Sequence, residues 1–452
     1  MKTRSSAILI LLSILVYNVS SGLHAYAQET VSRISLSEAL QIFASDNPQL
    51  KAMVSYRDAA EARVSETTSD YFPRVSVSAG YTRFEEDNII FPIHKVGVFP
   101  PLDDDIYESV AQMSVPIFNG GRTRSARHAS QATVHERDAQ IDLVNNNLIA
   151  AIGNIFIQAQ ELSDKLDLIK SQLEFLNRRY HEFTVLEKEG RVSLSDKALV
   201  QSEIENARSD SLEVESHCRG LSITLGQLLG REDPITPHIA LLPQSVFVEQ
   251  ATSLLSLSPA HDDKTAPEIQ IAEAQLNRTK ALKELSTRSF WPEISGVALY
   301  NFRSGDDLKF SNEWAAGVRI QMPLFDGGRR MAGISVAKAS FRAAQEQLES
   351  ERQKLVSKLQ IERNNWQTVQ IQQTHLEAAV SAKATSVESQ RELYKEGRIL
   401  LSGLLIQENE LLHMQIQERV ATYREMTALI NYYTMQGSLT TSLVEKLIRR
   451  MP

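Results

Sequence analysis

The sequence predicts a mixed α and β membrane protein, built from a duplicated helix–strand–strand–helix unit. The motif Pro-apolar-Phe-x-Gly-Gly-Arg occurs at Pro116–Arg122 and again at Pro323–Arg329, 207 positions later. A short segment of alternating apolar and polar residues precedes each copy, and a long proline-free segment with helical periodicity follows each copy. Because the whole ordered unit recurs, we interpret the chain as a structural duplication.

Composition and motifs exclude several classes of protein. The 452 residues carry a formal net charge of −8, whereas a nucleic-acid binder would show a basic surface, so we expect no nucleic-acid partner. The single cysteine, Cys218, excludes a disulfide framework and a cysteine-rich metal site. His128 and His135 lie seven positions apart, unlike the i, i+4 pair of a metalloprotease helix. The sequence has no phosphate-binding loop or nucleophile motif, so we expect no enzyme, cofactor or metal site.

Residues 1–27 are predicted to form a signal peptide. Two basic residues precede the apolar run Ala7–Val16, and Ala25-Tyr26-Ala27 supplies a small-x-small cleavage site. No cysteine follows the run, so we expect no N-terminal lipoprotein anchor. The rest of the sequence has no apolar run of the roughly 18 residues that a membrane-spanning helix needs. The mature chain would therefore enter a membrane as strands.

The first structural repeat is predicted over residues 28–230. It begins with a helix that Phe72-Pro73 ends, since the residue before proline avoids helical geometry. Two strands follow, at about 74–84 and 107–118, joined by an acidic loop. In the first strand, apolar residues alternate with small polar ones; the apolar set is Val75, Val77, Ala79 and Tyr81. This period of two over about ten residues is typical of a tilted membrane strand with one face toward lipid.

A helical hairpin is predicted over residues 122–229. Apolar residues recur every seven positions from Val134 to Phe183, which indicates helices packed side by side. Glu189-Gly190-Arg191 interrupts this pattern, and the returning helix ends at Gly230. A helix from 122 to 189 would be roughly 100 Å long at about 1.5 Å per residue. The tip of the hairpin would therefore lie far from the strands.

The second half of the chain is predicted to repeat the first. Trp291-Pro292 corresponds to Phe72-Pro73, and Glu396-Gly397-Arg398 corresponds to Glu189-Gly190-Arg191. A linker or equatorial region is predicted at 231–265, the second repeat at 266–437, and a C-terminal tail at 438–452. The second repeat would contain strands at about 293–303 and 313–325 and a helical hairpin at 329–436.

Four strands cannot close a barrel, and open strand edges in a bilayer leave backbone groups unsatisfied. Three copies would supply twelve strands, so the predicted assembly is a trimeric 12-stranded β-barrel continued by a long α-helical barrel. The change from strand to helix would occur at joints where glycine permits tight backbone geometry and proline ends the ladder. The joint residues are Pro116, Gly120, Gly121, Pro323, Gly327 and Gly328.

With its duplicated unit, two joints and two Gly-centred tips, the sequence resembles the TolC family of outer-membrane efflux proteins. The resemblance covers nearly the whole mature chain. It implies a homotrimeric duct, surrounded by lipid in the bacterial outer membrane and extending into the periplasm. It also implies that the duct passively conducts substrates exported by an inner-membrane pump through a periplasmic adaptor protein.

The resemblance also implies candidate site residues near the hairpin tips. Asp196 matches an acidic position of the family and Tyr394 a tyrosine position; with Arg398 they form a candidate periplasmic gate. The linking arginine of the family falls on Ile399 in this sequence, so Arg398 departs from the pattern by one position. The candidate adaptor-contacting tip residues are Gly190, Arg191, Gly397 and Arg398. For both sets, solvated helix residues are the alternative interpretation.

Two alternative functions are consistent with parts of the pattern. A duct for type I protein secretion would belong to the same family, because the pump rather than the duct selects the cargo. A secreted fibrous coiled coil or adhesin-like protein belongs to a different class. It would account for the signal peptide and the heptads, but not for four alternating strands in two matched pairs.

Overall fold

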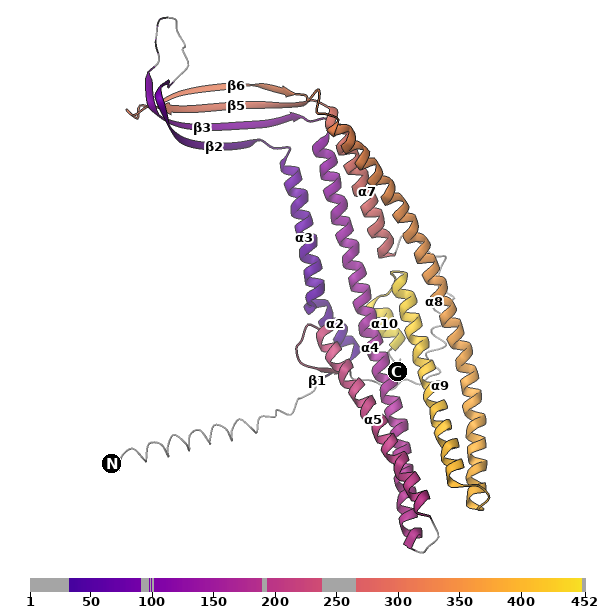
Figure 1. Ribbon diagram of the computed structural model, residues 1–452. Helices are drawn as coiled ribbons and strands as arrows, with labels where there is room; N and C mark the ends of the chain where they lie inside the picture. Colours follow the sequence, from indigo (N-terminus) through magenta and orange to yellow (C-terminus); the bar gives the residue numbers. More distant parts are fainter. Residues whose placement is uncertain are drawn as a thin grey trace, which may run out of the picture.

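The computed structural model describes residues 32–90, 97, 99, 101–188, 193–237 and 266–448. The predicted signal peptide, most of the 231–265 linker, and the tip residues Gly190 and Arg191 lie outside the described residues. The described chain is elongated: a sheet occupies one end, and long helices continue from it in one direction (Figure 1). Within the described ranges, none of the helices is both long and apolar enough to cross a membrane.

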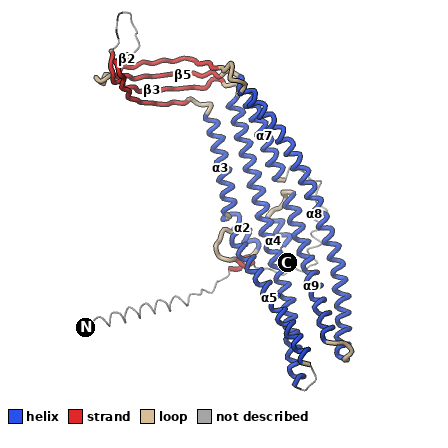
Figure 2. Tube along the Cα trace, in the orientation of Figure 1, coloured by secondary structure: helices blue, strands red, loops and turns tan. Residues whose placement is uncertain are grey.

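The sheet contains four antiparallel strands in the order β2-β3-β5-β6. Their bounds are β2 (Arg74–Ile89), β3 (Leu102–Phe118), β5 (Glu293–Ser304) and β6 (Ser311–Gln321). The two repeats meet where β3 pairs with β5, and β2 and β6 form the two edges of the sheet (Figure 2). Each repeat therefore contributes one edge strand and one inner strand.

The strand register brings the apolar residues of the four strands onto one face. In one row, Val75 pairs with Met113, Met113 with Ala298, and Ala298 with Ala316. Antiparallel partners point to the same side of a sheet, so these rows form a continuous apolar surface. The surface is open to solvent in the single chain: Val75 is 69% exposed and Trp314 is 73% exposed.

The observed strands depart from the predicted bounds at two places. β2 continues to Ile89 instead of ending near 84, and β3 begins at Leu102 instead of near 107. The acidic segment can join the sheet because Arg83 lies 3.0 Å from Asp104 and 3.6 Å from Asp105 across the strand pair, which offsets the negative charge. At the second joint, β6 ends at Gln321 instead of near 325, before Pro323, which has no N–H group to donate to a ladder.

Four helices run side by side from the sheet, with α3 against α4, α4 against α7, and α7 against α8 (Figure 1). They are α3 (Pro48–Ser69), α4 (Arg122–Lys188), α7 (Pro267–Thr287) and α8 (Arg329–Lys395). α4 and α8 each contain 67 residues, which gives each a length of roughly 100 Å at about 1.5 Å per residue. The helices α5 (Leu194–Leu228) and α9 (Leu401–Met435) return along them and complete two hairpins.

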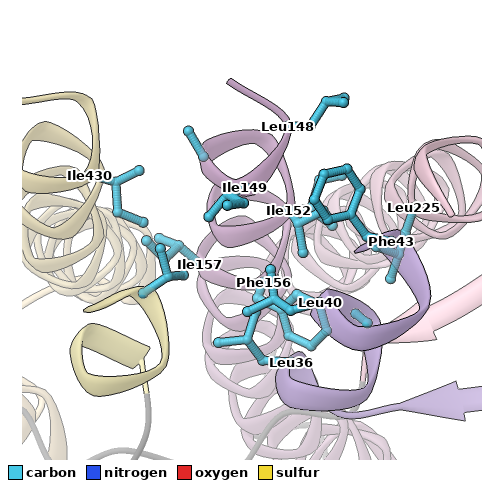
Figure 3. Packing of buried hydrophobic residues seen from close by; sticks show 14 of the residues in the cluster. Leu36, Leu40, Phe43, Leu148, Ile149, Ile152, Phe156, Ile157, Leu225 and Ile430 are labelled. Atoms are coloured by element: carbon cyan, nitrogen blue, oxygen red, sulfur yellow. The ribbon is translucent and has the colours of Figure 1, made fainter. Parts of the chain in front are cut away.

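The largest apolar core lies at mid-length, where both hairpins are anchored. Figure 3 shows Phe43 of α2 (Leu36–Asp46) and Leu225 of α5 close to Ile152 of α4, while Ile430 of α9 lies on the other side of α4. All four side chains are at most 1% exposed. Full burial of such a side chain stabilises the fold by about 1.5–3 kcal/mol. This core fixes the root of each hairpin. A second buried apolar cluster, which includes Phe183 of α4, Val200 of α5 and Leu401 of α9, packs the hairpins together nearer their tips.

Two regions predicted as linker and tail contain regular structure beside this core. β4 (Ile235–Pro237), inside the predicted linker, pairs in parallel with β1 (Ser32–Ile34). α10 (Thr441–Ile448), inside the predicted tail, carries the buried residue Val444 into the same core. Both elements are short, so their periodicity in the sequence is too brief to indicate them.

Asn47 caps the start of α3 and ties it to the end of α5. Its Oδ1 accepts a hydrogen bond from the Leu50 N–H at 2.9 Å and so caps α3, while its Nδ2 donates to the Leu228 carbonyl at 2.7 Å. Pro48 occupies the first turn, where its missing N–H costs nothing. The equivalent position in the second repeat, Ala266, makes no side-chain cap.

Candidate functional site at the hairpin junction

The two hairpins are joined near their tips by a carboxylate that two arginines share. Glu408 of α9 lies with Oε2 3.3 Å from Nη1 of Arg179 on α4, and with Oε1 2.9 Å from Nε of Arg391 on α8. The side chains of Arg179 and Glu408 are only 13% and 11% exposed. Charge-assisted contacts of this kind are stronger than neutral hydrogen bonds. One residue therefore connects the long helix of the first hairpin with both helices of the second.

A second polar chain runs parallel to the first. Gln172 of α4 donates from Nε2 to Oδ1 of Asn409 at 2.7 Å, and Asn409 donates from Nδ2 to Oε2 of Glu203 on α5 at 2.8 Å. Asn409 follows Glu408 directly in α9. Consecutive α9 residues thus bind both helices of the first hairpin.

Aromatic rings contact the arginines that share the carboxylate. The guanidinium carbon of Arg179 lies 4.8 Å from the ring centre of Phe175 and 5.6 Å from that of Tyr394. Such cation–π contacts hold the guanidinium in place while the carboxylate binds it. A cavity of about 330 Å³ beside this group is lined by Phe175, Arg391 and Leu405, among others.

The electrostatics keep the junction charged at neutral pH. Burial lowers the pKa of Arg391, but its hydrogen bonds to Glu408 and Glu388 outweigh burial, and the net pKa is raised. Burial raises the pKa of Tyr394; Arg179 opposes this rise, and the negative charge of Asp196 adds to it. Arg391 therefore remains protonated, and Tyr394 remains a neutral phenol.

The predicted gate residues are near this junction but are not linked to each other as hydrogen-bond partners. Asp196 lies in the first turn of α5: its N–H donates to Ser193 Oγ at 3.1 Å, and the Ser193 hydroxyl donates to Asp196 Oδ2 at 2.8 Å. Among the described residues, the Asp196 carboxylate thus binds a serine of its own helix cap, and its effect on Tyr394 is through charge alone. Arg398 is exposed and pairs with Glu396 at 3.4 Å, a surface contact of small value.

The remaining tip and joint residues have the backbone geometry that glycine favours. Gly397 has φ +71° and follows the end of α8. Gly120 and Gly121 have φ +66° and +81°, and the second joint repeats this with positive φ at Gly327 and Gly328. The predicted tip residues Gly190 and Arg191 fall outside the described residues.

The sequence motifs do not indicate Arg179 or Arg391, and Glu408 has one signal in the sequence. Glu408 follows Leu401 by seven positions and Leu405 by three, so it continues the apolar stripe of α9. A charged residue in such a stripe is buried only when it is paired. The stripe therefore indicated a partner, but not which helix would provide it.

Comparison with known proteins places this fold in a family. The sequence profile described as outer membrane efflux protein matches residues 39–231 and 264–438. The chain belongs to the outer membrane efflux protein family. This membership confirms the resemblance inferred from the duplicated motifs, and it places the protein in the bacterial outer membrane with an extension into the periplasm.

Individual relatives share this organisation at low sequence identity. Outer membrane protein TolC of Vibrio cholerae is 20% identical over 77% of this chain and 78% of its own length. Outer membrane protein TolC of Salmonella enteritidis is 23% identical over 95% of this chain and 86% of its own length. The fold is similar to that of a membrane protein from Pseudomonas aeruginosa, with a TM-score of 0.77, 16% identity and 94% coverage of each chain. It is also similar to outer membrane protein VceC of Vibrio cholerae, with a TM-score of 0.73, 14% identity, and coverage of 89% of this chain and 96% of that one.

Proposed function

We propose that the protein is the outer-membrane channel-tunnel of a tripartite efflux system. Three copies would close a 12-stranded β-barrel in the membrane and an α-helical barrel across the periplasm. The duct would passively conduct substrates that an inner-membrane pump delivers through a periplasmic adaptor protein. The observation that carries this proposal is a sheet with an exposed apolar face and two edge strands, β2 and β6, fused to helices roughly 100 Å long. Edge strands with free backbone groups do not persist in a bilayer, so another copy must pair with them.

The two strand–helix joints support assembly from several copies. At the first joint, the Phe118 and Trp291 rings pack edge to face with centroids 6.2 Å apart. At the second joint, the corresponding Phe325 is 90% exposed. The residue that corresponds to Trp291 is Phe72, which is 62% exposed and precedes β2 at the opposite edge of the sheet. We infer that Phe72 of the next copy covers Phe325, as Trp291 covers Phe118 within the chain.

The helices support the same arrangement. The row α3–α4–α7–α8 leaves one side of α3 and one side of α8 free of contact with the other helices of the row. Exposed apolar residues lie on α8, including Met331 at 64% and Val336 at 65%. Packing of α8 against α3 of the next copy would bury such residues and continue the row into a ring. A secreted fibrous coiled coil would leave the paired sheet without a role.

Cysteine cross-linking together with native mass tests this assembly. We expect the protein in mild detergent to have the mass of a trimer, and Phe72→Cys combined with Phe325→Cys to yield covalent dimers and trimers with a short thiol cross-linker. The matched control is Phe118→Cys combined with Trp291→Cys, which should link within one chain and leave the mass unchanged. The native Cys218 is present in both. A monomeric mass without cross-links between chains would refute the closed barrel, and planar-bilayer conductance of the trimer then tests the channel.

We further propose that the hairpin junction holds the periplasmic mouth closed. Movement of the second hairpin away from the first must separate Arg179 from Glu408 and Gln172 from Asn409, two contacts that join the hairpins and are half-buried or better. Tyr394 and Asp196 would contribute through ring contact and charge, and Arg398 from the exposed tip. In this proposal the adaptor binds the tips, at Gly190, Arg191, Gly397 and Arg398. Adaptor binding would then shift the equilibrium between the closed and the open arrangement of the hairpins, which the junction contacts hold in the closed arrangement.

A further inference from the structure

A groove between α4 and α7 lies immediately below the first strand–helix joint, where the two helices run side by side beneath the sheet (Figure 1). Its volume is about 520 Å³. The charged and hydrogen-bonding side chains considered below line the groove from both helices and from the turn after α7. They are Arg124, Ser125, His128, Lys280, Glu284 and Arg288. The hairpin junction near the tips is a separate site, because it is built from residues 172–203 and 391–409.

The groove carries an excess of positive charge. Three of its side chains are basic (Arg124, Lys280 and Arg288), and the one carboxylate, Glu284, lies 3.9 Å from Arg288. Arg288 also donates from Nη1 to the Gly120 carbonyl at 3.2 Å, and Arg124 donates from Nε to His128 Nε2 at 3.4 Å. In the part of the chain that the structure describes, neither Arg124 nor Lys280 forms an ion pair with a carboxylate. Their charge is available to an anion.

A buried hydroxyl with no partner lines the same groove. Ser125 is 1% exposed, and its Oγ has no hydrogen-bond partner among the described residues. Buried polar groups are nearly always paired, so the Ser125 hydroxyl that lines this groove has its hydrogen-bonding capacity available to a bound group. Ser125 also lies in the first turn of α4, which begins at Arg122, and the N-terminal end of a helix favours a negative charge.

We propose that this groove binds a phosphate group. Arg124, Lys280 and Arg288 neutralise its charge, and the Ser125 hydroxyl donates a hydrogen bond to one of its oxygens. Phosphate fits because it offers several acceptor oxygens to guanidinium, ammonium and hydroxyl donors at once. The phosphate has two possible sources at the membrane-proximal end of the helices: the headgroup of a membrane lipid, or a free phosphate in the periplasm.

Calorimetric titration of the full-length protein in non-ionic detergent at low salt tests the site, with inorganic phosphate and short-chain phosphatidylglycerol as the two probes. We expect wild type to bind, and Ser125→Ala and Arg124→Gln each to bind about tenfold more weakly, the effect of removing one hydrogen bond to a charged group. The control is Arg127→Gln, a basic residue of the same helix that does not line the groove, which should bind like wild type.

The outcomes separate the two sources. Tighter binding of phosphatidylglycerol than of inorganic phosphate identifies a lipid headgroup, and equal binding identifies free phosphate. Absence of binding by both probes overturns the proposal, as does an equal loss in Arg127→Gln and Ser125→Ala. Neither result depends on oligomeric mass or conductance, so this site can fail while the channel proposal stands.

Discussion

Glu408→Gln is the sharpest perturbation of the proposed closed state. The carboxylate is 11% exposed and contacts Arg179 at 3.3 Å and Arg391 at 2.9 Å. Glutamine keeps the shape and one acceptor oxygen but removes the charge. Hydrogen bonds to charged groups contribute about 1.5–3 kcal/mol, and each 1.4 kcal/mol changes an equilibrium about tenfold. Removal of the bond between Glu408 and Arg179, which joins the hairpins, should therefore raise the ratio of open to closed channels about 10- to 150-fold.

Single-channel recording in planar bilayers measures this ratio directly. The matched control is Glu410→Gln, two positions along α9, because Glu410 pairs with Lys383 inside the second hairpin and so does not connect the two hairpins. Arg179→Gln should have an effect similar to that of Glu408→Gln, and the double variant should show less than the sum of the two effects, since both remove the same ion pair. Conductance of Glu408→Gln equal to wild type, or an equal opening by Glu410→Gln, would refute the reasoning.

Three further predictions concern folding. Gly120→Ala should lower the free energy of unfolding by at least about 1–2 kcal/mol, because the backbone is left-handed there, and the added Cβ would also lie 2.4 Å from Trp291 Cβ. The control is Gly220→Ala within α5, where a Cβ would meet no neighbouring element within 4 Å and where alanine, the better helix former, should keep or raise the stability. An unfolding midpoint of Gly120→Ala equal to that of wild type would contradict the expectation. Asn47→Ala should cost about 0.5–2 kcal/mol through loss of the α3 cap, measured by denaturant unfolding followed by circular dichroism. Burial raises the pKa of Glu425 above its ordinary value of 4.5, so the wild-type free energy of unfolding should fall as pH rises from 4.5 toward the raised pKa. Glu425→Gln should lose that part of the pH dependence, and parallel stability–pH curves for the two proteins would disprove this assignment.

The sequence was most informative where one periodicity extends over many residues. Alternation indicated which side chains of β2 share a face, and the register then paired Val75 with Met113 and Val77 with Ala111 as apolar neighbours. Heptads similarly indicated long helices, because each apolar position adds to the same stripe. The extension of β2 to Ile89 could not be read in this way. It depends on Arg83 facing Asp105 across the strands, and that register follows from pairing rather than from either segment alone.

The contacts of the candidate site could not be predicted from the sequence, because they join distant segments. Arg179 and Glu408 are separated by 229 positions and meet only because α4 of one hairpin packs against α9 of the other. Family resemblance indicated Asp196 and Tyr394, whose positions flank the hairpin turns. The stronger contacts lie further from the turns, at residues that a tip motif does not include. The sequence motif therefore indicates positions beside the hairpin turns, whereas packing between distant segments decides which side chains bind one another.

In the proposed assembly, the asymmetry between the two halves of this duplicated chain would explain why one copy is insufficient. Between the repeats, β3 pairs with β5, α4 packs on α7, and Phe118 contacts Trp291. Because the chain is duplicated, each of these contacts has an equivalent pair of surfaces elsewhere in the chain. The two members of each equivalent pair lie at opposite edges of the chain and do not touch: β6 and β2, α8 and α3, and Phe325 and Phe72. Such heterologous edges are satisfied only by another copy, and a repeated rotation either closes a ring or extends as a fibre. In the proposed trimer, the contact between chains would therefore repeat the contact between repeats within one chain. If Phe72 and Phe325 fail to cross-link while Phe118 and Trp291 succeed, the internal contact does not describe the interface and a different surface must close the barrel.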